Sequence, residues 1–494
     1  MGFQQRRGGL GMNAIVSTVM ALVVTLNTAL ISTAQPAPRY TLFDLGTLGG
    51  PQTYLNLPGF PINNQGFVLG TSDTTIPDAD YPNFNPFMVG FPDPYLVQAI
   101  EWQKGRLINL GALPGNNSSA VFQVNNNGVG TGMSETATID PYTGWPSDHA
   151  VLFMNGRVVD LGTLPGGFES QACCITDQGL VAGFASNGTP DQVSFFGWGT
   201  QSRSFVWKDG VMHDIGTLGG PDAVMTIMNG RGQITGQSYT SATPNSSTGV
   251  PTVDPFLWQD GTMRDLGSLG GTLSGANWLS NAGEVTGQSN LPGDQVGHPF
   301  LWNGRQMLDL GTLGGDNGSA NAVNDGGVVV GSADLAGSRA HHAFRWINGS
   351  MTDLLPAQGA PCSNGFFVNS QGQLVGNSTD CHGNALAAML WDKGSAFDLN
   401  TLVTRSALHL TSAEYITNRG EVLAEGVLPN GEQRLAVLIP TGLVASSGLP
   451  SVVDSHPASI AQDATGVTSR LLDPRDFLGP SEDRLAARYH GRFP

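Results

Sequence analysis

One phrase, Asp-Leu-Gly-Thr-Leu-Gly-Gly, recurs along the 494-residue chain and constrains its fold more than any other feature. Successive copies are separated by 65, 51, 54, 51, 44, 44 and 45 residues. A period of this length is typical of architectures that repeat one supersecondary unit many times. The eight copies, of which the last two are degenerate, begin at Asp44, Asn109, Asp160, Asp214, Asp265, Asp309, Asp353 and Asp398.

Three further phrases accompany each copy. An apolar run ending in an aromatic residue precedes all but the first copy, as in His342–Trp346. An apolar-Asn pair follows, as in Val323-Asn324, and a run bounded by glycines comes last, as in Gly327–Gly331. Each phrase reads as one short strand, and Asp-Gly or Asn-Gly between the first two predicts a two-residue hairpin. A repeated unit of four antiparallel strands is a propeller blade.

The strand count predicts how the ring closes. The unit that begins at Leu42 lacks its first strand, while a matching run, Leu435–Ile439, has no later copy to precede. We therefore predict an all-β chain with an eight-bladed β-propeller of four-stranded blades over residues 40–440. Its C-terminal strand completes the first blade and closes the ring, which removes free sheet edges. An open β-solenoid is the alternative, and it would not require permuted ends.

The combined phrases resemble the repeats of the HAF-repeat (probable extracellular repeat) family. The tripeptide that names the family stands at His342-Ala343-Phe344, with variants at His149-Ala150-Val151 and His298-Pro299-Phe300. The resemblance covers roughly residues 40–440. It implies a secreted or surface-exposed microbial protein of unassigned activity, and it carries no catalytic residues over.

The N-terminus predicts export. Arg6 and Arg7 are the only charged residues before position 39, an apolar stretch follows over 14–31, and small residues end it at Ala34. Residues 1–34 therefore read as a signal peptide, for which a membrane anchor is the alternative. The adjacent arginines leave the export route open between Sec and twin-arginine. We expect an extracellular or periplasmic protein, without stable membrane insertion after cleavage.

The ends and the composition limit the partners. Residues 441–494 lose the repeat and show no anchor, so we expect a poorly ordered tail. The chain has 22 basic and 39 acidic residues and a net charge of −17, which argues against binding nucleic acid. Neither a phosphate-binding loop nor a Gly-x-Ser-x-Gly or His-Glu-x-x-His motif is present. No cofactor or catalytic residue is predicted, and whether the protein is an enzyme stays open.

Long connections in the first half of the chain, at 73–97, 135–148, 186–202 and 239–253, should share one face of the ring. Long loops on a rigid scaffold commonly carry binding sites. Their aromatic rings, beside carboxylates such as Asp78, Asp80, Asp140 and Asp191, suit sugar rings. The predicted ligand-binding residues are Tyr81, Phe84, Tyr142, Trp145, Phe196 and Trp198. Alternatively, these rings anchor the loops to the rim.

Two functions remain open. The first is a binding scaffold that holds an extracellular polysaccharide or a surface partner on the long-loop face. The second is a secreted polysaccharide hydrolase or lyase that draws its acids from several loops. Carboxyl groups that converge near the central channel would favour the enzyme, whereas exposed aromatic rings on outward loops would favour binding.

The repeated polar residues have structural interpretations. His149, His298 and His342 share a position that other units fill with Gln98 or Arg203, so we predict polar strand starts rather than ligands. The repeated Asp of the Asp-Leu-Gly phrase fits a turn whose carboxylate accepts backbone N–H groups, rather than a calcium array. The repeated Trp should form the core between blades. Asp78-Ala-Asp80 lacks a ligand-rich loop, and we predict no metal site.

Four cysteines complete the candidates. Cys362 and Cys381 flank the third and fourth strands of one unit, which brings them nearly opposite, so we predict a disulfide. Cys173 and Cys174 are neighbours on the equivalent strand of another unit. Because successive strand residues point to opposite faces, a bond between them needs a distorted backbone. One buried and one free thiol is the simpler interpretation.

Overall fold

The structure, a computed structural model, describes residues 37–443 except 56–59, 64, 89–91, 116, 247 and 405. The strands all belong to the second of two units of the chain, which begins at Pro38. The predicted signal peptide at 1–34 lies outside the described residues. So does the predicted tail, apart from residues 441–443.

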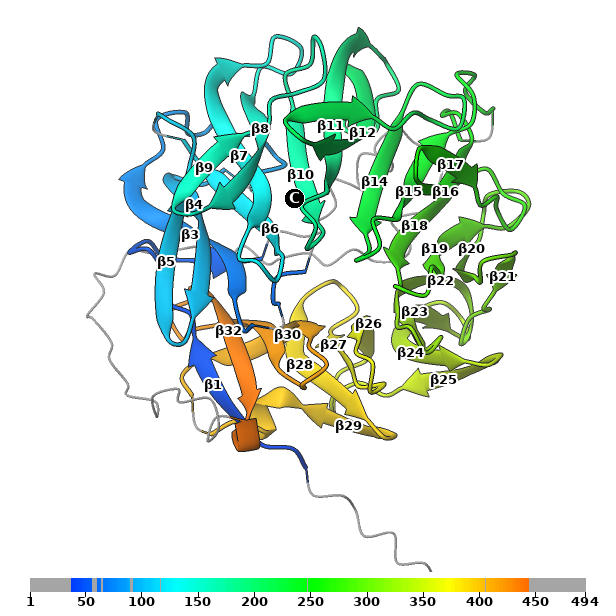
Figure 1. Cartoon of the computed structure of the whole chain (residues 1–494). Coiled ribbons are helices and arrows are strands. Elements are labelled where there is room, and N and C mark those ends of the chain that lie inside the picture. The colour runs from blue at the N-terminus through cyan, green and yellow to red at the C-terminus, as the bar shows by residue number, and fades with distance from the viewer. Residues whose placement is uncertain are drawn as a thin grey trace, which may run out of the picture. The chain divides into compact units, whose positions relative to one another are not determined.

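The second unit is an eight-bladed β-propeller of antiparallel four-stranded blades arranged in a ring (Figure 1). We number the blades 1 to 8 along the chain and give their strands from the centre outward. Blades 1 to 4 comprise β2 (Thr53–Tyr54), β3 (Val68–Pro77), β4 (Tyr95–Gln103) and β5 (Arg106–Gly111); β6 (Ser119–Val124), β7 (Gly130–Ile139), β8 (Pro146–Met154) and β9 (Arg157–Asp160); β10 (Ser170–Ile175), β11 (Val181–Pro190), β12 (Thr200–Lys208) and β13 (Val211–Asp214); and β14 (Ala223–Met228), β15 (Ile234–Tyr239), β16 (Val253–Gln259) and β17 (Thr262–Asp265).

The remaining blades repeat this arrangement. Blades 5 to 8 comprise β18 (Ser274–Leu279), β19 (Val285–Asn290), β20 (Gly297–Trp302) and β21 (Met307–Asp309); β22 (Gly314–Val323), β23 (Val329–Leu335), β24 (His341–Ile347) and β25 (Ser350–Leu354); β26 (Cys362–Val368), β27 (Leu374–Thr379), β28 (Ala385–Asp392) and β29 (Ser395–Asp398); and β30 (His409–Ile416), β31 (Val422–Val427), β32 (Gln433–Pro440) and β1 (Tyr40–Asp44). A 3-10 turn, η1 (Leu399–Thr401), follows β29. Blades 3 and 4 form one continuous sheet through a parallel pair, Arg203 with Ala223.

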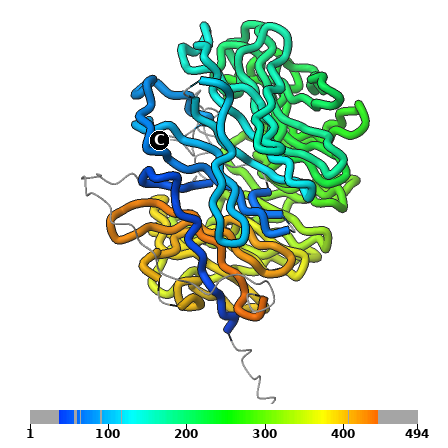
Figure 2. The backbone as a smooth tube through the Cα atoms, turned by 60° about the vertical axis from the view of Figure 1, so that its left-hand side comes forward, coloured from blue at the N-terminus to red at the C-terminus, as the bar shows by residue number. Residues whose placement is uncertain are grey.

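The predicted closure of the ring is confirmed. Strand β1 pairs with β32 from Tyr40 opposite Pro440 to Asp44 opposite Ala436. Figure 2 shows the N-terminal segment in blue beside the C-terminal strand in orange. Segments from the two ends of the repeat region therefore complete one sheet.

The strands are grouped differently from the sequence unit. Each sheet starts at the centre with the apolar-Asn strand and ends outside with the Asp-Leu-Gly strand. In blade 8 a single N-terminal strand, β1, thus completes three C-terminal strands, whereas the sequence predicted that the C-terminal strand would complete the first blade. The Gly-Thr-Leu-Gly-Gly segments are therefore the connections between blades, while the long loops join the two middle strands within a blade. Strand order along the chain is the same in both groupings, so the sequence did not distinguish them.

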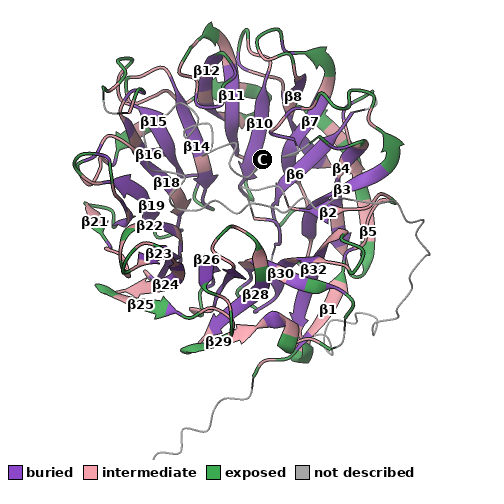
Figure 3. Ribbon diagram, turned by 180° about the vertical axis from the view of Figure 1, so that it is seen from behind, coloured by how far each residue is buried: buried purple, intermediate pink, exposed green. Residues whose placement is uncertain are grey.

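Packing is densest at the middle strands and the inner strands, whereas the outer strands are more exposed (Figure 3). A glycine recurs in the second strand of a blade because a side chain would not fit there. At Gly132 a Cβ atom would lie 1.9 Å from the carbonyl oxygen of Ala120 in the neighbouring inner strand. Corresponding glycines with a Cβ distance of about 2 Å to a backbone oxygen are Gly183, Gly236, Gly287, Gly331 and Gly376.

The innermost strands of blades 2 to 8 share a β-bulge at the same repeat position. Side chains at this position link neighbouring blades. Thr226 Oγ1 donates to Ala276 O at 2.8 Å, and Asn321 Nδ2 donates to Gly365 O at 2.8 Å. A bulge releases one residue from the ladder, so its side chain is free to reach the next blade.

The Asn of the apolar-Asn phrase makes a second set of links. Asn125 Oδ1 accepts the N–H groups of Asn127 and Val129, each at 3.0 Å, while its Nδ2 donates to Thr176 O of the next blade at 3.1 Å. Asn63, Asn229, Asn324 and Asn369 make the same link to the blade that follows each of them. The repeated Asn therefore shapes its own turn and joins two blades.

The structure resolves both cysteine questions. The predicted disulfide between Cys362 and Cys381 is confirmed, with the Cα atoms 5.2 Å apart. Cys173 and Cys174 are also bonded to each other, so the interpretation of one free thiol was wrong. The bulge in β10 falls between Ala172 and Cys174. It supplies the backbone distortion that a regular strand lacks.

Candidate functional site: the long-loop face

The hairpins on one face of blades 1 to 3 project further than the others. Strands β3, β7 and β11 are 10 residues long, while the second strands of the later blades have 6 or 7. Sequence reasoning assigned much of this length to loops. After a break in register the strands pair again, as at Ile139 with Pro146. The connecting loops are consequently shorter, at 78–94, 140–145 and 191–199.

Two of the predicted binding residues expose their rings on this face. Tyr81, in loop 78–94, is 51% exposed and Tyr142, in loop 140–145, is 48% exposed. Asn83 Nδ2 donates to Gly144 O at 3.1 Å and so ties the two loops together. The third loop also lies close, because a Cβ atom on Gly199 would be 3.5 Å from the Cβ atom of Tyr142.

Carboxylates accompany these rings. Asp78 is partly buried and Asp80 is exposed, and the Asp80 N–H donates to Asp78 Oδ1 at 2.9 Å. Burial raises the pKa of Asp78. We call Tyr81, Tyr142, Asp78 and Asp80 the tyrosine surface. It offers flat apolar rings next to hydrogen-bond acceptors.

The other four predicted rings are anchors rather than exposed faces. Phe196 and Trp198 are 1% and 0% exposed, and Phe84 and Trp145 are partly buried against the same core. Ring centroids of Phe196 and Trp198 are 4.8 Å apart, and Phe87 lies 5.1 Å from Phe196. The short loop 191–199 must turn these rings inward to cover the apolar interior of blades 2 and 3. Phe196 and Trp198 therefore anchor their loop to the rim of the ring, which was the alternative interpretation of these residues.

Sequence reasoning missed a set of buried carboxyl groups beneath the loops. Burial and the neighbouring Asp93 carboxyl raise the pKa of Asp73 to about 8. Burial raises the pKa of Glu135 to about 7. The only available signal was their shared place in the repeat, since Gly70-Thr-Ser-Asp73 and Gly132-Met-Ser-Glu135 match each other and end in an acid.

A second group of acids lies at the entrance to the inner strands. Burial, together with Asp140, raises the pKa of Glu169, which precedes β10. Burial, together with Asp191, raises the pKa of Asp222, which precedes β14. Asp148 is fully buried beside Glu169, and its pKa is also well above the ordinary range. Of the acids named from sequence, Asp140 and Asp191 belong to this buried network, whereas Asp78 and Asp80 lie on the tyrosine surface.

The repeated His and Asp residues meet at the outer strands. His149 Nδ1 lies 3.0 Å from Asp160 Oδ1, and two further His-Asp pairs and an Arg-Asp pair occupy the same position in other blades. The Asp carboxylate also accepts the N–H of the Gly two residues later, as expected for a turn residue. In blade 4 both positions are acidic, and burial together with Asp265 raises the pKa of Asp254 to about 6.

Within the described parts of the chain, no three His, Cys, Asp or Glu residues are grouped so that they could hold a metal ion. The same residues contain no helix with the length and apolar character needed to span a membrane.

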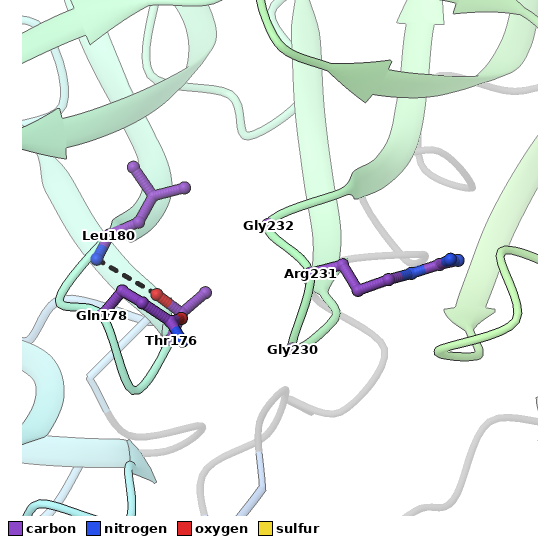
Figure 4. A pocket seen from close by; sticks show the side chains of 6 residues that line it. All are labelled: Thr176, Gln178, Leu180, Gly230, Arg231 and Gly232. Carbon is purple, nitrogen blue, oxygen red and sulfur yellow. Dashed lines mark hydrogen bonds between the residues drawn. The ribbon is translucent and has the colours of Figure 1, made fainter.

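The opposite face carries a pocket of about 400 Å³ at the seam between blades 3 and 4 (Figure 4). It is lined by Thr176, Gln178, Leu180, Gly230, Arg231 and Gly232. Thr176 stands where five other blades have the linking Asn and, like Ser280 and Thr417 at the same position, it has no amide to donate. Arg231 extends away from Thr176, and its Nη2 donates to Gln233 Oε1 at 2.8 Å. The pocket therefore marks a missing link between blades.

We expect Thr176→Asn to stabilise the ring. The new amide can donate to Asn229 O, as Asn125 does to Thr176 O, and its oxygen can replace the hydroxyl that accepts the Leu180 N–H at 3.2 Å. One added hydrogen bond should increase the free energy of unfolding by about 1 kcal/mol, measured by chemical denaturation. Thr176→Val is the control without a donor. Equal stabilities of the two variants would contradict this account of the seam.

No known family model and no curated protein matches the chain. Among solved structures, the β-propeller domain of the Trilobed protease from Pyrococcus furiosus is 10% identical, with a TM-score of 0.42, and the match covers 70% of this chain and 95% of that one. A PL25 ulvan lyase is 9% identical, with a TM-score of 0.34 and coverage of 84% and 100%. TolB from Acinetobacter baumannii is 14% identical, with a TM-score of 0.29 and coverage of 48% and 59%. These similarities concern the fold.

Proposed function

We propose that this protein is an exported, HAF-type β-propeller that binds an extracellular polysaccharide on its tyrosine surface. One observation carries the proposal: Tyr81 and Tyr142 expose about half of their side chains on two loops that are tied together by Asn83. A solvent-exposed ring on a fixed loop can stack on the C–H face of a sugar. Asp78 and Asp80 supply acceptors for its hydroxyl groups.

Export is supported by two features. The sequence of residues 1–34 has the pattern of a signal peptide. The disulfide between Cys362 and Cys381 is of the kind that persists in oxidising compartments. An extracellular or periplasmic location is thus part of the proposal, and so is membership of the HAF-repeat family.

The hydrolase alternative is weaker, because most perturbed carboxyl groups are inaccessible to a polymer. Asp73, Asp148, Glu169 and Asp222 are all buried. Asp222 accepts two backbone N–H groups, and Glu169 accepts one backbone and one side-chain N–H. Their contacts are those of groups that hold loops in place. A glycosidase instead needs two acids on either side of an accessible bond.

The test is affinity electrophoresis in gels that contain soluble xylan, pectin or a cellulose derivative. We expect the chain lacking residues 1–34 to be retarded by at least one of these polymers. Tyr81→Ala/Tyr142→Ala should weaken that binding by about tenfold or more, because two stacking contacts are lost. Leu355→Ala removes an exposed apolar side chain that follows β25 of blade 6, and it should not change retardation. Equal retardation of the tyrosine variant and the wild type would refute the proposed surface.

A further inference from the structure

Three carboxyl pairs lie where the long loops meet the ring. The paired acids are Asp73 with Asp93, Asp140 with Glu169, and Asp191 with Asp222, and in each pair one carboxyl group raises the pKa of the other. In each pair one acid belongs to a loop: Asp93 to loop 78–94, Asp140 to loop 140–145 and Asp191 to loop 191–199. Its partner lies in or beside a strand of the ring. The same device therefore fastens the loops of blades 1, 2 and 3.

Backbone N–H groups already occupy one oxygen of each loop acid. Tyr95 N donates to Asp93 Oδ1 at 2.9 Å, Tyr142 N to Asp140 Oδ1 at 2.8 Å, and Val193 N to Asp191 Oδ1 at 3.0 Å. The ring acids are held similarly. Gln52 N donates to Asp73 Oδ2, Asp148 N donates to Glu169 Oε2, and Phe195 N donates to Asp222 Oδ2.

In each pair one oxygen has no such donor. Asp73 Oδ1, Glu169 Oε1 and Asp191 Oδ2 are buried without an N–H or O–H donor from any other side chain or from the backbone. A carboxylate is only an acceptor, so two of them can bond directly only when one carries a proton. Buried acceptors that face each other would otherwise remain unsatisfied and repel.

The surroundings supply little positive charge. Asp73 faces Asp93, Tyr54 and Arg434, and Asp93 also faces Asp78. Glu169 faces Asp140 and Asp148, and Asp222 faces Asp191. Asp148 also faces Glu135, which has Asp78 and Asp80 beside it. Arg434 is the single base in this set, and it acts on the pair in blade 1. In blades 2 and 3 the paired acids face other acids, and Arg203 lies beside the pair in blade 3, where its Nη1 donates to Pro221 O at 3.0 Å.

We propose that shared protons in these pairs fasten the long loops to the ring, so that the tyrosine surface is held in place in acid and released as the pH rises. The regulation of ligand binding rests on the proposed function, whereas the release of the loops does not. Loop 140–145 carries Tyr142, and Glu169 also accepts Asn85 Nδ2 of loop 78–94 at 3.0 Å. Loss of the proton shared with Asp140 would therefore loosen the loop that bears Tyr142, whereas the Asn85 hydrogen bond, which needs only an acceptor, would persist.

The direction of the pH dependence follows from the raised pKa values. An acid whose pKa is higher in the folded state than in the unfolded chain contributes stability that is fully present below the unfolded value. That contribution is lost as the pH rises through the folded value, which is about 8 for Asp73 and well above the ordinary range for Glu169 and Asp222. Release should consequently occur on the alkaline side of neutrality.

The test is amide hydrogen exchange of the wild-type chain at about pH 5 and about pH 9, compared as protection factors. We expect protection in loops 140–145 and 191–199 to fall by about tenfold or more at the higher pH, while the inner strands keep theirs. Loops that are equally protected at both pH values would overturn the proposal. Loosening by EDTA at the lower pH would also overturn it, because a cation would then hold the pairs.

Two variants act as reciprocal controls. In Glu169→Gln the amide can donate to Asp140 in place of the shared proton, so loop 140–145 should stay protected at high pH while loop 191–199 still loosens. In Asp191→Asn the amide can donate to Asp222, and the pattern should reverse. Asp209→Asn changes an exposed turn where another blade has Asn155, and it should behave as the wild type. Joint loosening of both loops in every variant would contradict a role for these pairs.

Affinity electrophoresis with the polysaccharide that binds most tightly separates the two proposals. Wild-type binding that weakens about tenfold at high pH, and that Glu169→Gln retains, supports the switch at the proposed site. Protection that changes with pH without any polysaccharide binding would leave the switch standing and remove the proposed function. Binding at both pH values with constant loop protection would do the opposite.

Discussion

A chain that ends after Asn430 should lose the single cooperative unfolding transition of the propeller. The truncation removes β32, which is the sheet partner of β1 along its whole length and also pairs with β31. Leu435, Val437 and Leu438 of β32 are almost completely buried. Each such side chain contributes about 1.5–3 kcal/mol, and a whole domain is stable by only about 5–15 kcal/mol.

Thermal unfolding followed by circular dichroism checks this result. A chain that ends after Leu443 is the matched reference, because it keeps all of β32 while it also lacks the residues that follow. We expect the reference to melt in one sharp transition and the shorter chain to melt broadly at a much lower temperature, or not to fold. Identical melting of the two chains would mean that β32 does not close the ring.

Trp198→Ala should be among the most destabilising single substitutions on the long-loop face. The Trp198 ring is fully buried and lies 4.8 Å from Phe196 and 5.6 Å from Phe87, centroid to centroid. Removal of a buried Trp leaves a cavity and costs about 3–5 kcal/mol. Its Nε1 has no hydrogen-bond partner, so Trp198→Phe loses apolar contact but no hydrogen bond.

Chemical denaturation of four proteins measures this effect. Relative to the wild type, we expect a loss of about 3–5 kcal/mol for Trp198→Ala and a clearly smaller loss for Trp198→Phe. Tyr81→Ala should change the free energy of unfolding by less than about 0.5 kcal/mol, because the ring is half exposed. A tolerated Trp198→Ala would return this residue to the candidate ligand contacts.

Sequence periodicity predicted the ring because each phrase has one structural task in every copy. The Asp-Leu-Gly turn, the linking Asn and the recurrent glycine each follow from local geometry, and the unpaired strand Leu435–Ile439 predicted closure. The boundary of a sheet could not be predicted, because strand order is identical wherever the count begins. The Cys173–Cys174 bond also escaped prediction, since it depends on a bulge that no residue type announces.

The candidate site was predictable in location but only partly in composition. Loop length marked the face on which the hairpins of blades 1 to 3 project, and Tyr81 and Tyr142 are exposed there. Aromatic residues alone do not reveal which ring faces solvent, because Trp198 is buried by tertiary contacts with Phe87 and Phe184 from other segments. Carboxyl pairs such as Asp140 with Glu169 join residues from neighbouring blades, so their proximity becomes visible only in three dimensions.

The most direct test of the account is one incubation of the chain lacking residues 1–34 with xylan, pectin, chitin and cellulose. Bound protein and new reducing ends are measured in the same samples over time. The account predicts retention on at least one polymer without release of reducing ends. Release of reducing ends that Asp140→Asn or Glu169→Gln abolishes would contradict it, because these buried carboxyl groups would then be catalytic acids rather than loop fasteners.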